Sequence, residues 1–159
     1  PFNGHQSIFH LQPYAMKVYH QRWYVVGYLK EQEGIRNIAL DRILEMELTD
    51  DSFILPNDFD AEEYYAHTVG IFVNDKLKPQ KVVVRVFGVH VEYMRSLHFS
   101  QQEIKTEHKE YSDFEYQLCL TPELTSQLLA MGEKIEVMEP IGLREEIRKR
   151  LFAAINRYK

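Results

Sequence analysis

The stretch that decides the fold of the first half is Arg22-Trp23-Tyr24-Val25-Val26-Gly27-Tyr28-Leu29. Aromatic and β-branched side chains suit a pleated, partly buried surface, so this stretch predicts a β-strand. A polar run follows over residues 30–34, ending in a glycine that can adopt positive φ, and an apolar run returns over residues 35–43. We therefore predict an antiparallel hairpin, with the large aromatic side chain of Trp23 in the core.

The residues that flank this hairpin predict further short elements. Upstream we expect two strands, over residues 7–12 and 15–20, separated at Pro13, where a missing N–H does least harm. Downstream, residues 44–48 either extend the hairpin strand or begin another. The chain then turns acidic, and residues 60–65 predict a short helix because Asp60 can cap its free N–H groups.

The second half of the chain has a different pattern of secondary structure, in which predicted strands and helices are mixed. The patterns predict strand 81–87, helix 89–98, strands 102–108 and 111–120, helix 122–131 and strand 135–138. That order is the ferredoxin-like βαββαβ plan. Gly132 fits the C-terminal cap of the preceding helix, and an amphipathic helix over residues 143–158 closes the chain.

A polar stretch over residues 74–79, ending in Pro79, separates the strand-rich first half from the mixed second half and is the expected linker. The sequence thus predicts an α+β protein of two small domains, residues 1–74 and 79–159. With 159 residues, 45% of them hydrophobic and 27% charged, the composition is ordinary for a soluble globular protein. No apolar run approaches the ~20 residues of a membrane helix, and no secretory signal is visible.

Charge and cysteine content narrow the setting. The net charge of −5 excludes the bulk positive charge that drives nonspecific nucleic-acid binding, so any nucleic-acid contact must be local. The acidic excess lies in the first 78 residues, which hold 7 basic and 12 acidic side chains. The single cysteine, Cys119, forms no internal disulfide, and its apolar neighbours favour a small buried side chain; a reducing cytoplasm is the simplest setting.

Motifs of enzymes are missing from the sequence. It contains no Gly-rich phosphate loop, no Gly-x-Ser-x-Gly elbow, no His-Glu-x-x-His and no dinucleotide fingerprint. The seven histidines lack the spacing of metal ligands, and the acidic stretch lacks the glycine and terminal glutamate of a calcium loop. We expect no enzyme activity, no cofactor and no metal site.

Basic and aromatic residues on the predicted hairpin form a candidate binding site. Strand alternation puts Arg22 and Tyr24 on one face of the first strand, and Arg36 and Arg42 on one face of its partner. Arginine clamps phosphate or carboxylate with two parallel hydrogen bonds, and tyrosine offers a ring for stacking. The alternative stays open that these arginines only form surface ion pairs with nearby acids, namely Asp41, Glu45 and Glu47.

The residues in order resemble a known family. Leu11-Gln12-Pro13-Tyr14, Gln21-Arg22-Trp23-Tyr24-Val25-Val26-Gly27-Tyr28 and the run from Ile35 to Ile43 resemble the WYL domain of bacterial transcriptional regulators, with Val25 in place of the leucine of that name. Glu136-Val137-Met138-Glu139-Pro140 and Leu143-Arg144-Glu145-Glu146-Ile147 resemble the WCX extension that follows many WYL domains. The resemblance implies an Sm-like, strongly bent β-barrel followed by a ferredoxin-like domain with a C-terminal helix.

The resemblance also implies a function. WYL barrels are thought to sense a ligand, often nucleic acid or a nucleotide, in regulators that bind DNA through an N-terminal helix-turn-helix domain. Carried over by position, the ligand site would comprise Arg22, Tyr24, Arg36 and Arg42, together with Tyr14, Lys17 and His10. The resemblance therefore implies a sensor of an anionic effector, as a homodimer in the cytoplasm. The alternative is a dimerisation or interaction module without a small ligand, since a ferredoxin-like sheet and a final amphipathic helix offer surfaces for self-association.

Overall fold

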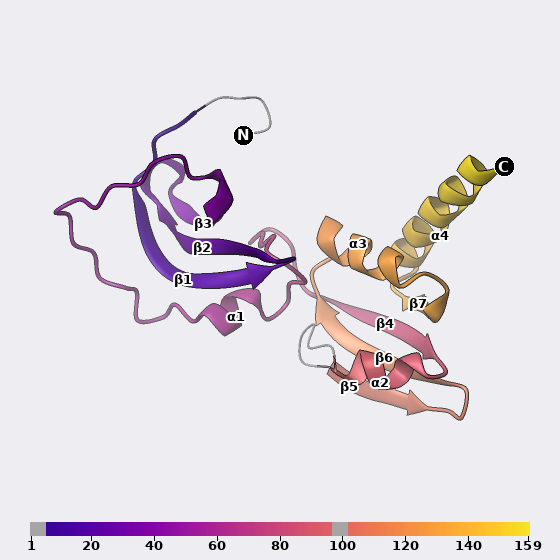
Figure 1. Ribbon diagram of the computed structural model, residues 1–159. Coiled ribbons are helices and arrows are strands. Elements are labelled where there is room, and N and C mark those ends of the chain that lie inside the picture. Colours follow the sequence, from indigo (N-terminus) through magenta and orange to yellow (C-terminus); the bar gives the residue numbers. More distant parts are fainter. Residues whose placement is uncertain (1–5, 97–101) are drawn as a thin grey trace. The chain divides into compact units, whose positions relative to one another are not determined.

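The aromatic stretch at residues 22–29 forms the central strand of the first unit of the structure. In the computed structural model, which describes residues 6–96 and 102–159, the chain divides into two compact units, Pro1–Ala61 and Glu62–Lys159. In the first unit, β2 (Arg22–Leu29) pairs antiparallel with β1 (Leu11–Tyr19) and β3 (Gly34–Ala39), in the order β1-β2-β3 (Figure 1). The predicted hairpin is confirmed.

Strand β1 is continuous where the sequence predicted two strands broken at Pro13. The chain keeps its pairing with β2 through a register shift between Pro13 and Ala15. Gly27 stands opposite Pro13, and a Cβ atom on Gly27 would lie 2.2 Å from the carbonyl oxygen of Gln12. The absent side chain of Gly27 therefore allows the two strands to approach at the bulge, so the proline bends the strand without ending it.

Turn residues set the two reversals of this sheet. His20 and Gln21 both have positive φ, 47° and 63°, which is the geometry of a two-residue hairpin turn whose twist matches its strands. Between β2 and β3, a 3₁₀ turn at Lys30–Gln32 is followed by Glu33 with φ of 47°, so Glu33, and not Gly34 as expected, takes the left-handed conformation. A second 3₁₀ turn, Leu40–Arg42, ends β3 earlier than the predicted strand over residues 35–43.

The described part of the first unit is an open three-stranded sheet, so the barrel that the resemblance implies is not seen among the described residues. Closing a sheet requires its first and last strands to pair, whereas within the described residues β1 and β3 each pair with β2 alone. Trp23 also departs from its predicted burial, with 54% of its surface exposed. It lies at the end of the sheet opposite Val18, which is itself 52% exposed.

The second unit has the predicted order of strands and helices. After helix α1 (Ala61–Tyr65), the elements are β4 (Gln80–Phe87), α2 (His90–Ser96), β5 (Gln102–Glu107), β6 (Tyr111–Leu118), α3 (Pro122–Met131), β7 (Ile135–Glu139) and α4 (Ile141–Ile155). The four strands form an antiparallel sheet in the order β5-β6-β4-β7. The last residues of the predicted helix 89–98 lie outside the described residues. The α+β class is confirmed.

The core of the second unit follows from strand alternation. Val82, Val84 and Val86 of β4 are at most 1% exposed and lie on the same side of the sheet as Phe114 and Tyr116 of β6. Helices supply the other side of this core, through Met94, Leu124, Leu128, Leu143 and Ile147. The predicted apolar face of the last helix is buried only in its first half, since Leu151 and Ile155 are 45% and 59% exposed.

Local signals begin and end helix α3 as the sequence indicated. Thr121 accepts a hydrogen bond from the backbone N–H of Leu124 at 3.1 Å, and Pro122 occupies the first turn. Gly132, with φ of 57°, follows the last helical residue. These caps hold the helix in register on the sheet, which lets Leu124 and Leu128 reach the core.

Candidate functional site

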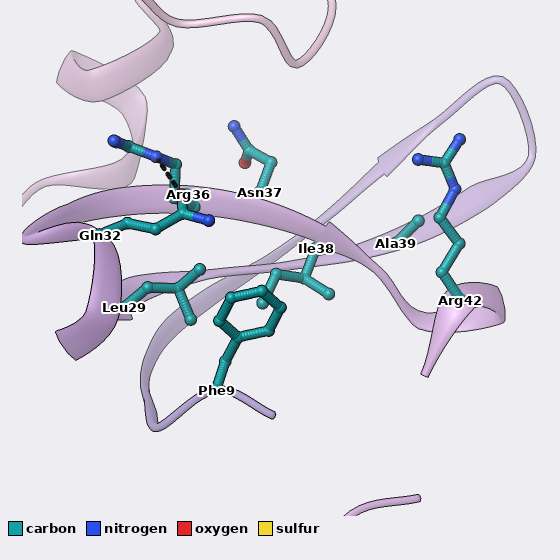
Figure 2. A pocket seen from close by; sticks show the side chains of 8 residues that line it. All are labelled: Phe9, Leu29, Gln32, Arg36, Asn37, Ile38, Ala39 and Arg42. Atoms are coloured by element: carbon teal, nitrogen blue, oxygen red, sulfur yellow. Dashed lines mark hydrogen bonds between the residues drawn. The ribbon is translucent and has the colours of Figure 1, made fainter. Parts of the chain in front are cut away.

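A hollow of about 230 Å³ lies on one face of the first sheet. Cross-strand pairing puts Leu29, Arg36 and Ile38 on this face, because alternate residues of a strand point the same way. The hollow is lined by Phe9, Leu29, Gln32, Arg36, Asn37, Ile38, Ala39 and Arg42 (Figure 2). It therefore combines apolar side chains with two guanidinium groups from β3 and the turn after it.

Arg36 is held at the edge of the hollow by two neutral oxygens. Its Nε donates to the side-chain oxygen of Gln32 at 2.9 Å, and Nη1 donates to the backbone carbonyl of Ile35 at 2.8 Å (Figure 2). The guanidinium also lies over Gly34, where a Cβ atom would come within 2.8 Å of Nη1. These contacts orient the group without neutralising its charge, so it retains the electrostatic character needed to bind an anion.

Arg42 reaches the same hollow from the 3₁₀ turn that ends β3. Figure 2 shows Arg36 and Arg42 at opposite ends of the site, with Asn37 between them and Phe9, Leu29 and Ile38 on the apolar side. The structure thus brings together two of the four arginine and tyrosine residues of the predicted hairpin site. Arg36 and Arg42 are not neighbours within the hollow: Arg36 lies on β3 and Arg42 in the 3₁₀ turn that follows it.

Arg22 and Tyr24 do not line the hollow. They lie on the opposite face of β2, as strand alternation requires. Arg22 Nε is 3.5 Å from Asp41 Oδ2, and both side chains are about half exposed. Arg22 therefore forms the surface ion pair that the alternative interpretation expected. Tyr24 is half-buried and stands opposite Lys17 of β1.

Lys17 and Tyr14 lie outside the hollow as well. Partial burial lowers the pKa of the Lys17 ammonium group. Tyr14 packs its ring against Phe59 and Phe53, with ring centroids 4.9 and 6.1 Å apart. These contacts tie the irregular segment after β3 to β1, which gives Tyr14 a packing role in the sheet.

His10 does not line the hollow, but its hydrogen bonds fix the backbone next to Phe9, which does. Its backbone N–H donates to the two carboxylate oxygens of Glu31 at 3.0 and 3.1 Å, and its Nδ1 lies 2.6 Å from Oε1. The N–H of Lys30 donates in turn to the His10 carbonyl at 3.1 Å. These hydrogen bonds lower the pKa of the Glu31 carboxyl and fix the chain beside Phe9.

Phe9 and Gln32 are the site residues that sequence reasoning missed. Phe9 precedes β1 in a segment without regular structure, and the contacts of His10 with Glu31 and Lys30, distant in the chain, bring it to the hollow. Gln32 lies four residues before Arg36 in a polar turn. The sequence could have indicated Gln32 through its place in a polar turn four residues before Arg36. No sequence pattern indicates that Phe9 belongs to the site.

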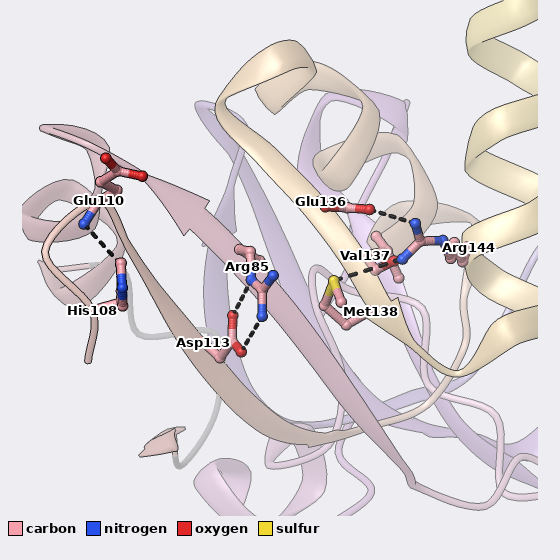
Figure 3. A network of polar contacts seen from close by, with 8 residues as sticks. All are labelled: Arg85, His108, Glu110, Asp113, Glu136, Val137, Met138 and Arg144. Atoms are coloured by element: carbon pink, nitrogen blue, oxygen red, sulfur yellow. Dashed lines mark hydrogen bonds and ion pairs between the residues drawn. The ribbon is translucent and has the colours of Figure 1, made fainter. Parts of the chain in front are cut away.

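The second unit carries a polar network that is internally satisfied. Arg85 of β4 makes two hydrogen bonds to the carboxylate of Asp113 on β6, at 2.8 and 2.9 Å, and lies 3.9 Å from the ring centroid of Tyr111 (Figure 3). Arg144 of α4 contacts the Glu136 carboxylate and donates to the Val137 carbonyl (Figure 3). Each charge has an opposite charge beside it, so this network ties the sheet and the last helix together and is not a candidate anion site.

Metal and thiol chemistry find no support in the described residues. Within residues 6–96 and 102–159, no group of three or more His, Cys, Asp or Glu side chains could hold a metal ion. Cys119 is 8% exposed, and burial raises the pKa of its thiol, in agreement with the expected small buried side chain. In the same described part of the chain, no helix has the length and apolar character needed to cross a membrane.

Comparison with known proteins gives the class of the chain. Residues 2–48 match the WYL domain family and residues 78–155 match the WCX domain family. The chain therefore carries a WYL domain followed by a WCX domain, the arrangement of WYL-type transcriptional regulators, and this confirms the resemblance seen in the sequence.

A solved structure gives a more distant likeness. The chain is similar to proteasome accessory factor B/C (PafBC) of Arthrobacter aurescens, with 20% sequence identity and a TM-score of 0.42. The match covers 98% of this chain and 23% of the PafBC chain, so the chain spans about a quarter of that protein's length. No curated protein matches the sequence.

Proposed function

We propose that the chain is the ligand-sensing regulatory part of a bacterial transcriptional regulator, and that an anionic effector binds in the hollow between Arg36 and Arg42. The effector class is a nucleotide or a short single-stranded nucleic acid. One observation carries the proposal: two guanidinium groups line the same hollow as an apolar surface that includes Phe9, Leu29 and Ile38. Because a bacterial regulator meets its DNA in the cytoplasm, the proposal places the chain there.

The two kinds of lining suit the two parts of a nucleotide. A phosphate accepts paired hydrogen bonds from a planar guanidinium, and Arg36 is already oriented by Gln32. A base stacks on aromatic or apolar side chains, and Phe9 keeps 44% of its surface exposed at the site. Because only these few cations are needed, the net charge of −5 is compatible with such a ligand.

Several parts of this proposal rest on the resemblance and stay predictions. These are the Sm-like and ferredoxin-like architectures, the domain limits 1–74 and 79–159, DNA binding through a helix-turn-helix domain, and a homodimer. The same holds for a contribution of Arg22, Tyr24, Tyr14, Lys17 and His10 to the ligand site. Their positions outside the hollow give them a smaller expected effect on affinity than Arg36 and Arg42.

Titration of the purified chain tests the site. We expect labelled single-stranded oligonucleotides or nucleotides to bind in fluorescence anisotropy, with an affinity that falls as salt rises. Replacing both arginines (Arg36→Ala, Arg42→Ala) removes charge-assisted hydrogen bonds and should weaken binding at least about tenfold. Arg148→Ala is the matched control, because Arg148 pairs with Glu145 on helix α4 of the second unit.

Two results would overturn the site. The first is no measurable binding of any nucleotide or oligonucleotide at low salt. The second is equal affinity of the wild type and the double variant. If Arg22→Ala weakens binding while the double variant does not, the ligand lies on the opposite face of β2, where Arg22 and Tyr24 lie.

The alternative function, an interaction module without a small ligand, is favoured by a different observation. The second half of α4 exposes Leu151, Phe152 and Ile155 at 45%, 62% and 59%. Apolar side chains gathered on one helix commonly mark a contact with another protein chain. Binding of the anionic ligands at the arginines separates the two functions, since a pure interaction module has no such affinity.

A further inference from the structure

The two guanidinium groups of the hollow lie at its opposite ends, which limits the shape of a ligand that contacts both. Arg36 belongs to β3, and Arg42 follows in the 3₁₀ turn after that strand (Figure 2). Because a strand rises about 3.3 Å per residue, the part of β3 from Arg36 to Ala39 alone spans roughly 10 Å. A ligand that reaches both guanidinium groups must therefore carry two anionic groups held apart.

Arg36 keeps donors for one of these anionic groups. Its Nε donates to Gln32 at 2.9 Å, and its Nη1 donates to the Ile35 carbonyl at 2.8 Å. A guanidinium has five N–H donors, so these two contacts leave donors on both Nη1 and Nη2. Two such nitrogens match two oxygens of one phosphate. Arg42 has a further interaction within the chain, and the argument requires of it only the positive charge at its end of the hollow.

The size of the hollow limits the part of the ligand between the two anionic groups. Its volume of about 230 Å³ is below the roughly 300 Å³ at which pockets for drug-sized ligands begin. The hollow can take one base beside Phe9, whose side chain is 44% exposed, but not a run of stacked bases. One nucleoside is therefore the body that the lining accommodates.

This inference rests on the proposed function and names its ligand more closely. We propose that the hollow binds one nucleoside with a phosphate on each side, the 3′,5′-bisphosphate unit, with one phosphate at Arg36, the other at Arg42 and the base beside Phe9. The unit exists as a free nucleotide and as an internal nucleotide of a single strand. A cyclic monophosphate has one phosphate, and a 5′-triphosphate carries all its phosphates on one side of the sugar, so neither spans the two arginines.

Calorimetric titration of the full chain with matched nucleotides tests the ligand. Adenosine is a suitable nucleoside for the probes, because every base has a face on which an aromatic ring can stack. We expect adenosine 3′,5′-bisphosphate to bind at least about tenfold more tightly than the 3′-monophosphate, the 5′-monophosphate, the cyclic monophosphate or the 5′-triphosphate, since it alone makes charge-assisted hydrogen bonds at both ends.

Substitutions at each end of the hollow test whether each arginine holds one phosphate. Arg36→Ala should abolish the contribution of one of the two phosphates to affinity and preserve that of the other, and Arg42→Ala should do the converse. Gln32→Glu sets a carboxylate against the Nε of Arg36, so it should reproduce the loss seen with Arg36→Ala. Arg22→Ala is the matched control, because Arg22 pairs with Asp41 outside the hollow, and it should preserve both contributions.

Strands of increasing length distinguish the two sources of the unit. A trinucleotide that binds as tightly as the free bisphosphate, with no further gain in longer strands, identifies an internal nucleotide as the ligand. Tighter binding of the free bisphosphate than of any strand identifies the free nucleotide. If Arg36→Ala does not fold by circular dichroism, Gln32→Glu decides alone.

The overturning results differ from those of the proposed function. Absence of binding by any nucleotide or oligonucleotide at low salt would overturn the proposed function and this inference together. Nucleotide binding without preference for the bisphosphate would overturn the inference alone. The same holds for an affinity that keeps rising with strand length beyond three nucleotides, or for arginine substitutions that reduce the contributions of both phosphates equally.

Discussion

At the scale of single residues, Gly27 is the position where the first sheet tolerates no side chain. A Cβ atom there would lie 2.2 Å from a backbone oxygen of Gln12, which cannot move without breaking the pairing of β1 with β2. We expect Gly27→Ala to lower the free energy of unfolding by about 1–3 kcal/mol, as overpacking does elsewhere. Chemical denaturation monitored by circular dichroism measures this change.

Gly142 is the matched control for Gly27. It lies in helix α4, and no atom comes within 4 Å of a Cβ placed on it. We expect Gly142→Ala to shift stability by no more than about 1 kcal/mol, in the stabilising direction, because alanine favours the helix. Equal effects of the two substitutions would contradict the close approach at Gly27.

The pair of Arg85 and Asp113 makes the stability of the second unit depend on pH. The Arg85 guanidinium lowers the pKa of the Asp113 carboxyl below its ordinary value of 3.8. Because the folded-state pKa is the lower one, the stabilisation is fully present above pH 3.8 and is lost as the pH falls through the folded-state value. Asp113→Asn should therefore destabilise the chain by about 1–3 kcal/mol near neutral pH.

The measurement for this pair is the free energy of unfolding of both proteins from pH 7 down into the acid range. The difference between wild type and Asp113→Asn should shrink once the pH passes below the ordinary carboxyl value. A difference that stays constant with pH would mean that the charge of Asp113 does not contribute through Arg85.

At the scale of elements, the turn after β2 positions the segment that carries Phe9. The Glu31 carboxylate accepts the His10 N–H at 3.0 and 3.1 Å, which fixes the backbone next to Phe9. We expect Glu31→Ala to speed amide exchange at residues 6–10. It should also weaken effector binding by about threefold to tenfold, because the ligand must then order this segment itself.

Glu33→Ala is the control for this turn, since Glu33 is exposed and lies two residues away. Because Glu33 has a left-handed backbone, Glu33→Asn, which tolerates that conformation, is measured beside it. Faster exchange at residues 6–10 without any change in affinity would separate the two claims. The contact would then hold the segment, while Phe9 would not belong to the ligand site.

At the scale of the whole molecule, the two units differ in how much core they contain. The large cluster of buried residues draws only on the second unit, from Val69 to Ile147. Within the described residues 6–61, the buried apolar residues of the first unit are Val25, Val26, Leu29 and Ala39. Since burial of apolar area supplies most of the stability, the first unit should open at lower free energy than the second.

Hydrogen exchange of the intact chain checks this difference. Amides of β2 should exchange faster than amides of β4 and β6 under conditions where exchange follows local opening. Equal protection of the three strands would mean that the units unfold together.

Local patterns along the chain were enough to predict most elements. The aromatic and β-branched run of β2, the cap residues Pro122 and Gly132 and the βαββαβ order all depend on neighbours within a few residues, so the sequence indicates them directly. The family resemblance was readable for the same reason, since its motifs are short and ordered. These features include the face of β3 on which Arg36 lies.

Contacts between distant residues decided the rest. Trp23 is a large aromatic residue of the kind usually found in a core, but it is 54% exposed. Burial depends on whether another element covers that face of the sheet, and the local sequence does not show this. Arg22 lies beside Asp41, while Arg36 and Arg42 share a hollow whose wall includes Phe9, brought there by His10 and Glu31. Sequence alone determined which side chains are available for an anion, and the tertiary structure decided which of them meet, since only folding sets distances between residues far apart in the chain.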